Sequence, residues 1–316
     1  MKQKSFYSLL QIGIIALASS MLCACIEKEE GNDQEKMQKN ISFAVSADPE
    51  GETPATRGSQ VTTLSSFGMI ATVYPSNETY TGQSLGNYFY NLEVEPLVPT
   101  IYLWPTADHR MAFYGHYPYG NANISISSQG TAGSPTYTYT VPENISSQVD
   151  FMTTEVLDHT CGSQDPLALT FHHRLSDIRF TAVNDHSAAI VVKSVSLLGV
   201  KYVGTLSGST WTPSGDVNTV MSHPFTLTCN TSVAAGSSSD LTGTTNHFLM
   251  IPQTVGAETE MITVVTEENS EEKTYTYELP SSVTLSAGQV YNYTLTFSES
   301  SGLIVSTDSD IEDWEE

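Results

Sequence analysis

The feature that most constrains the fold is an alternation of apolar and polar residues with a period of two. In residues 291–297, Tyr291, Tyr293, Leu295 and Phe297 alternate with polar residues. Successive side chains of an extended strand point to opposite faces, so this pattern places four large apolar groups on one face. The same period occurs in residues 275–279 and 41–47. The pattern predicts half-buried β-strands.

Turn residues separate these strand-like runs. Clusters of Pro, Gly, Asn and Ser occur at residues 75–77, 118–121, 131–135 and 212–215. Short strands joined by frequent turns are typical of β-sandwiches, and a chain of 316 residues has room for two domains. We therefore predict an all-β fold with an N-terminal sandwich over residues 41–165 and a C-terminal sandwich over residues 166–316. The boundary is set by Pro and Gly within residues 161–166, although an internal loop would have the same composition.

The N-terminus has the composition of a lipoprotein signal peptide over residues 1–24. Lys2 and Lys4 precede an apolar run, Leu9–Leu22, which is too short to span a bilayer stably. We expect this segment to be removed before the protein folds.

Cys25 is the predicted lipidation site. Leu22 lies three residues before it and Ala24 directly before it, which resembles the bacterial lipobox. Cys23 fits the pattern less well, because Ser20 would then occupy the leucine position.

Residues 25–40 are predicted to be a flexible acidic tether. They have no aromatic or β-branched residue after Ile26, so they cannot bury enough apolar surface to offset the chain entropy lost on folding. An acidic run after a lipidated cysteine also resembles the export signal of Bacteroidetes lipoproteins that reach the outer face of the outer membrane. The simpler alternative is a solvated spacer.

The charge balance argues against a nucleic-acid partner. The formal net charge is −23, and a field of this sign repels phosphate while it keeps an exposed protein soluble. Beyond the signal peptide no apolar run reaches membrane-spanning length, so the lipid is the only membrane attachment that the sequence predicts. Cys161 and Cys229 leave a disulfide open as one alternative.

A search for catalytic and metal-binding patterns is negative. The chain has 8 histidines, but the adjacent pair His172 and His173 would point to opposite faces of a strand and could not bind one ion. No Gly-x-Ser-x-Gly, phosphate-binding loop or Cys-x-x-Cys pair is present. We predict no catalytic residue, no metal site, no cofactor and no enzymatic activity.

Six pieces of the chain follow one another in a characteristic order: residues 41–43 with 55–58, 104–105 with 113–118, 169–178, 249–253, 287–293 and 311–314. In these pieces and their order the chain resembles the fimbrillins, which are type V pilus subunits of Bacteroidetes. The resemblance implies two tandem transthyretin-like Greek-key β-sandwich domains, assembly into a fimbria and a role in cell adhesion.

The resemblance also implies processing by an Arg-specific surface protease. Family subunits travel to the outer membrane as lipoproteins and are cut after an arginine, which removes the lipid together with the first strand. Arg57 is the predicted cleavage site, because it follows a loop of Pro and small residues at 53–56 where a protease could reach extended backbone. The other arginines lie beside or within strand-like runs.

Cleavage after Arg57 would release the strand that contains Ile41, Phe43 and Val45. Their departure would expose unpaired backbone groups and apolar slots, which a strand donated by another pilus subunit could fill. Burial of three such side chains contributes roughly 5–9 kcal/mol before ordering costs. Residues 300–316 show little alternation of apolar and polar residues, so they predict a weak donor strand. A tip, minor, stalk or anchor position in the fimbria therefore stays open.

The alternative from another class is a surface glycan-binding lipoprotein of the outer membrane. Tyr114, Tyr117 and Tyr119 beside Trp104 could form an aromatic platform for a sugar. Aromatic residues near Pro pack into a core or a turn more often, so we expect a structural role for these four.

Overall fold

The computed structural model describes residues 40–47, 64, 66–80, 84–95, 102–105, 108–127, 135–161, 166–307 and 312–313, all of which belong to a unit formed by residues 38–316. These residues form β-strands and a single 3-10 turn, η1 (Ile145–Ser147). None of them forms a helix that is long and apolar enough to cross a membrane. The predicted all-β fold is confirmed.

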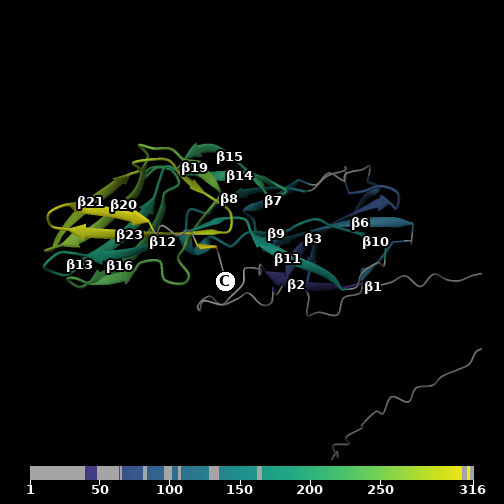
Figure 1. Ribbon diagram of the computed structural model, residues 1–316, viewed down its shortest axis with the longest axis horizontal. Helices are drawn as coiled ribbons and strands as arrows, with labels where there is room; N and C mark the ends of the chain where they lie inside the picture. The colour runs from purple at the N-terminus through teal and green to yellow at the C-terminus, as the bar shows by residue number, and fades with distance from the viewer. Residues whose placement is uncertain are drawn as a thin grey trace, which may run out of the picture. The chain divides into compact units, whose positions relative to one another are not determined.

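The first large sheet has seven strands and belongs mainly to the N-terminal half (Figure 1). A further pair, β1 (Asn40–Ile41) with β5 (Tyr102–Leu103), shares the hydrophobic core of this sheet. β10 (Leu157–Thr160) pairs with one side of β6. The other strands lie in the spatial order β2 (Phe43–Ala47), β11 (Leu167–His173), β9 (Met152–Thr154), β6 (His109–Tyr117), β3 (Phe67–Pro75) and β4 (Gly86–Val94).

Two facing sheets of the C-terminal half enclose the larger hydrophobic core. The residues of β23 predicted to face one side, Tyr291 through Phe297 in alternation, are all buried there. One sheet has the order β17 (Ser238–Asp240), β12 (Ser176–Asn184), β23 (Gln289–Ser298) and β24 (Gly302–Thr307), with β18 (Phe248–Met250) on β12 and β25 (Glu312–Asp313) on β23. The other has the order β16 (Phe225–Val233), β13 (Ile190–Leu197), β20 (Glu260–Glu268) and β21 (Glu271–Glu278).

A further four-stranded sheet combines strands from both halves of the sequence. The hairpin of β7 (Ile124–Ser127) and β8 (Thr136–Thr140) pairs with the hairpin of β14 (Lys201–Ser207) and β15 (Thr210–Val217). Tyr137 and Tyr139 of β8 are buried in the larger core, although they precede the predicted boundary near residue 165. Conversely, β11 comes after the predicted boundary in the sequence but belongs to the first sheet, where it pairs with β2 and β9. The two cores agree with tandem sandwiches, and the residue boundary between them stays a prediction.

Gly68 and His116 face each other across β3 and β6, and they depend on each other sterically. His116 is 2% exposed, and a Cβ atom at Gly68 would lie 1.9 Å from its Cε1 atom. Only a residue without a side chain leaves room for the imidazole ring at this place. Burial in turn lowers the pKa of His116 to about 4.

We predict that Gly68→Ala lowers the free energy of unfolding by about 1–3 kcal/mol, because the added methyl group overlaps the buried ring. Thermal or urea unfolding followed by circular dichroism measures the effect. Gly256→Ala is the matched control, since its Cβ would meet only Thr259 Oγ1 at 3.9 Å. Equal stability of the two variants would contradict the steric role of Gly68.

His116 should make the fold sensitive to acid. Its folded pKa of about 4 lies below the value of about 6.5 for an unfolded chain, so only the unfolded state takes up this proton between those values. Stability should therefore fall as the pH drops from about 6.5 to 4, by up to about 3 kcal/mol. His116→Leu should flatten this part of the pH profile, whereas Gly256→Ala, which leaves every histidine in place, should keep the wild-type slope. Parallel profiles for wild type and His116→Leu would refute the assignment.

Candidate functional site

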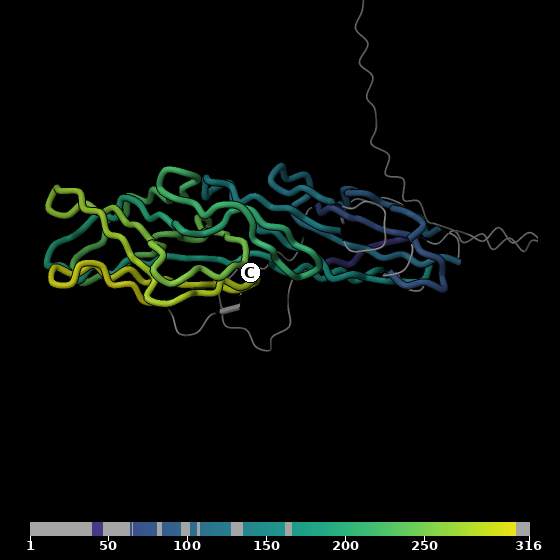
Figure 2. Tube along the Cα trace, turned by 90° about the horizontal axis from the view of Figure 1, so that it is seen from above, coloured from purple at the N-terminus to yellow at the C-terminus, as the bar shows by residue number. Residues whose placement is uncertain are grey.

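The candidate site is the first strand segment, residues 40–47, and the groove that holds it. β1 pairs antiparallel with β5, and Ile41 lies opposite Tyr102. After Ser42 the chain continues as β2, which pairs parallel with β11 from Phe43 opposite Leu167 to Ala47 opposite Phe171. The segment thus crosses from the small β-pair to the large sheet and contacts both. Both views show the purple first strand beside the teal trace of β11 (Figures 1 and 2).

The three residues predicted to anchor this segment do point into the core. Ile41 is 2% exposed, whereas Phe43 and Val45 are half-buried and pack against the smaller core. The Phe43 ring lies among aromatic rings of β3, β5 and β6. The centroid distances are 6.1 Å to Phe67, 6.2 Å to Tyr102 and 6.1 Å to Phe113. Two of these contacts are edge-to-face, the geometry that aromatic quadrupoles favour.

β2 is an edge strand. It is the first strand in the order of its sheet, and β11 is its only strand partner in the described part of the chain. The side chains that alternate with the anchors, Ala44 and Ser46, are exposed. β2 can therefore separate from β11 without the loss of any other pairing within this sheet.

The surface beneath the segment is strongly apolar. Leu167, Leu169 and Phe171 of β11 are almost fully buried, and so is Trp104, which follows β5. Phe43 and Val45 keep part of their surface exposed. The three anchors together therefore contribute about 4–6 kcal/mol by apolar burial, less than the roughly 5–9 kcal/mol expected from the sequence for three fully buried side chains. Loss of the segment would expose this surface and the free backbone groups of β11.

The groove residues could not be identified from the sequence, although one signal was present. Leu167, Leu169 and Phe171 show the period of a half-buried strand, but nothing in the pattern says that their neighbour is a strand more than 100 residues earlier, as the register Leu167 to Phe43 shows. Tyr102, which contacts Phe43, carries no sequence signal at all.

Cys25 and Arg57, the predicted lipidation and cleavage sites, lie outside the described residues. The other arginines are all held in ion pairs. Arg110 Nη2 lies 3.0 Å from Asp158 Oδ2, and Arg179 Nη2 lies 2.6 Å from Asp177 Oδ2. Arg174 is 6% exposed and lies 2.9 Å from Glu155 Oε1 through its Nη2 atom.

The aromatic platform considered for the glycan-binding alternative is not exposed. Trp104 is 1% exposed and packs edge-to-face on Phe113 at 5.7 Å, and Tyr114 is 4% exposed. Tyr117 and Tyr119 are half-buried. The expectation that these residues serve core and turn packing is correct.

Two buried carboxylates in the C-terminal half have structural partners. Asp177 accepts hydrogen bonds from Arg179 and lies 3.0 Å from His247 Nδ1. Burial alone would lower the pKa of His247, but its hydrogen bond to Asp177 raises the pKa overall. Glu268 accepts hydrogen bonds from Thr266, Lys273 and Tyr275.

Metal-binding and redox sites are not evident in the described ranges. Their His, Cys, Asp and Glu residues form no group of three or more that could hold a metal ion. Cys161 and Cys229 are both free thiols, with Cys161 just after β10 and Cys229 within β16.

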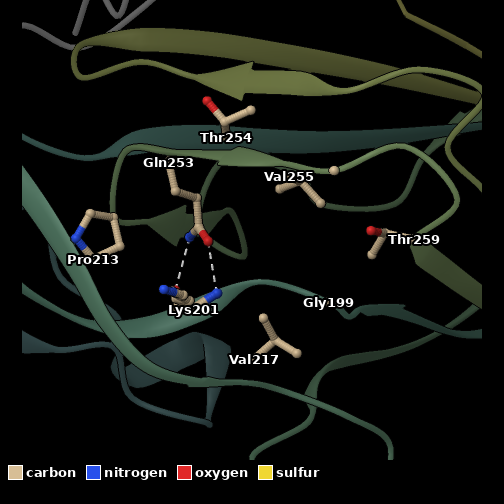
Figure 3. Close-up of a pocket in the computed structure, with 9 residues that line it drawn as sticks. Gly199, Lys201, Pro213, Val217, Gln253, Thr254, Val255 and Thr259 are labelled. Carbon is tan, nitrogen blue, oxygen red and sulfur yellow. Dashed lines mark hydrogen bonds between the residues drawn. The ribbon is translucent and has the colours of Figure 1, made fainter.

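A small pocket of about 310 Å³ lies among β14, β15 and β19 (Gln253–Val255), the strand that pairs with β22 (Val283–Leu285) (Figure 3). The side-chain amide of Gln253, which lines the pocket, already makes hydrogen bonds within the protein. Gln253 Oε1 accepts a hydrogen bond from the Lys201 backbone N–H at 2.8 Å, and its Nε2 donates to the Lys201 carbonyl at 2.9 Å. The Gln253 side chain thus makes the two backbone hydrogen bonds of Lys201 that a neighbouring strand would otherwise make. Its role is therefore structural.

The chain belongs to the fimbrillin-like family, whose family model matches residues 33–314. No curated protein matches the chain. Among solved structures, the fold is similar to that of a fimbrial protein from Bacteroides vulgatus, with 18% identity and a TM-score of 0.63 over 87% of this chain and 99% of that one. It is also similar to a candidate cell adhesion protein from Bacteroides ovatus, with 17% identity and a TM-score of 0.54 over 89% of this chain and 99% of that one. At these identities the likeness concerns the fold.

Phe43→Ala should loosen the first strand segment, residues 40–47, without disturbing the larger core of the C-terminal half. We expect a cost of about 1–2 kcal/mol, less than for a fully buried phenylalanine, because the ring is only half-buried. Hydrogen exchange measured by mass spectrometry should become faster in residues 40–47 and 167–171 and stay unchanged in β12 and β23. Ala44→Ser, at an exposed position of the same strand, is the control. Exchange that rises equally in all strands would show that β2 is not a separable element.

Proposed function

We propose that the chain is a structural subunit of a surface fimbria, in a tip, minor or stalk position, and that it assembles by β-strand exchange after proteolysis. Membership of the fimbrillin-like family supports the fimbrial role. The observation that carries the exchange mechanism is the placement of residues 40–47, an edge segment whose buried side chains cover an apolar groove.

In this proposal the precursor reaches the outer membrane as a lipoprotein acylated at Cys25. While β1 and β2 occupy the groove, β11 has a strand partner and cannot pair with another chain. This protects the precursor from premature association, because an unpaired sheet edge is a template for a further strand. The lipid keeps the subunit at the membrane during this stage.

An Arg-specific surface protease then cleaves after Arg57 and separates the segment from the body of the protein. The ion pairs of Arg110, Arg174 and Arg179 support this choice of arginine, since each places its side chain within or beside paired strands. Proteases require extended and accessible backbone, which strand pairing denies at Arg110 and Arg179 and burial denies at Arg174.

The strand that replaces residues 40–47 comes from another pilus subunit. To reproduce the native register it must run parallel to β11, and its alternate side chains must be apolar where Ile41, Phe43 and Val45 now lie. Main-chain hydrogen bonds along β11 would supply affinity, and the three slots would supply specificity.

β24, a strand near the C-terminus, supports a tip or minor position over a stalk position. β24 is an edge strand on β23, and only Leu303 and Val305 of it pack against the larger core. Thr307, the next residue on that face, is exposed. This strand offers two apolar side chains for a groove that accepts three, so we propose that the chain accepts a strand more readily than it donates one.

Limited digestion of the full chain with an Arg-specific protease tests the proposal. We expect one cut after Arg57, followed by self-association or uptake of a strand, detected by gel electrophoresis without boiling. A synthetic peptide with the sequence of residues 40–47 should bind the clipped protein and compete with assembly, because it fits the vacated groove.

Two controls make this experiment decisive. Arg57→Gln should stay uncut and monomeric under the same conditions. A peptide with Asp in place of Phe43 should not bind, since it would bury a charge among three aromatic rings. A clipped protein that remains monomeric, binds no peptide and takes up no strand from a sibling subunit would overturn the exchange mechanism.

A further inference from the structure

The opposite edge of the first large sheet carries an unusual pair of tyrosines. β4 is the last strand in the order of this sheet and pairs only with β3 among the described strands. Tyr88 is 40% exposed and Tyr90 is 53% exposed, and Leu85 just before the strand is 58% exposed. Together they are three of the seven large hydrophobic residues that are exposed in the described part of the chain.

Both tyrosines lie at irregularities in the pairing of β4 with β3. Ala71 is paired with Phe89 and Thr72 with Asn87, so Tyr88 has no residue opposite it. Met69 is paired with Leu92, so Tyr90 and Asn91 together face Ile70 alone. Such bulges redirect side chains and interrupt the regular row of backbone groups. They therefore make this edge a poor template for a further β-strand, while Tyr88 and Tyr90 lie on its exposed face.

The rings are held in place by their hydroxyl groups. Tyr88 Oη donates a hydrogen bond of 2.7 Å to the carbonyl of Leu103 in β5, and Tyr90 Oη donates a long one of 3.5 Å to the carbonyl of Ile126 in β7. The Tyr88 ring also contacts the Phe89 ring, at a centroid distance of 4.8 Å. Because each hydroxyl bonds within the protein, the parts of these side chains that face solvent are fixed and largely apolar.

The charges on this edge restrict what can bind. β3, β4 and β5 contain no Lys or Arg, whereas Glu93 of β4 and Glu95 just after it are exposed. An anionic ligand would be repelled by these carboxylates and by the net charge of −23. A ligand suited to this edge has an apolar face that stacks on fixed aromatic rings and neutral hydroxyl groups that donate to carboxylates.

From these observations we infer that the β4 edge, with Tyr88 and Tyr90 as its contact residues, binds a neutral saccharide. The apolar C–H face of a sugar ring matches an exposed tyrosine ring, and a neutral sugar carries no charge that Glu93 and Glu95 would repel. This site differs from the groove of β2, which lies at the other edge of the same sheet. It is also distinct from the residues around Trp104 that the sequence suggested.

Affinity electrophoresis of the full chain in native gels tests the inference. The probes are the neutral polysaccharides dextran, laminarin, mannan and galactan, with heparin and alginate as anionic comparisons. We expect at least one neutral polysaccharide to retard migration and neither anionic one to do so. The retardation should persist when the salt concentration is raised, because stacking is screened little by salt.

Tyr88→Ala and Tyr90→Ala should each weaken the retardation about fivefold to tenfold, while Tyr90→Phe, which keeps the ring, should retain most of it. Met221→Ala is the matched control, since it removes a side chain that is 91% exposed at another place. Circular dichroism verifies that each variant is folded.

Three results would overturn the inference. They are migration unaffected by every neutral polysaccharide, retardation equal in wild type and both alanine variants, and binding only to a basic peptide such as oligolysine at low salt. The last would show that the edge recognises cationic protein segments instead of sugars.

Discussion

The parallel pairing of β2 with β11 is the interaction on which the smaller core depends. It brings β2 against a strand that follows more than 100 residues later, as the register Phe43 to Leu167 shows. Through Phe43 it contacts the rings of Phe67 and Phe113, which are buried in that core together with Ile41 and Trp104. A strand at a sheet edge is held on one side only, so the contact that completes the core is also the one that the proposed exchange would replace.

Strands that cross the predicted boundary make each core depend on both halves of the sequence. β11 completes the first sheet, while Tyr137 and Tyr139 of β8 are buried in the larger core. The two edges of the first sheet are protected differently. β2 carries alternating exposed residues and can leave, whereas β4 has bulges that disfavour any further strand. This asymmetry agrees with strand uptake at one edge and ligand contact at the other.

How far the sequence predicts the site differs from residue to residue. The anchors Ile41, Phe43 and Val45 follow from alternation, because a period of two is a local property of the strand. Their partners Tyr102 and Leu169 do not follow, since pairing over long sequence distances leaves no local signature. Residues 88–90 also look like a regular strand, and only the register with β3 reveals the bulges at Tyr88 and Tyr90.

The sequence alone determined the all-β class, the strands with one buried face and the apolar side chains of the first strand. These depend on local periodicity and on turn residues, which act within a few positions of the chain. Only the tertiary structure decided that β2 lies at an edge and that it runs parallel to β11. Those outcomes depend on which distant strands pair, and pairing is selected by the packing of the whole core.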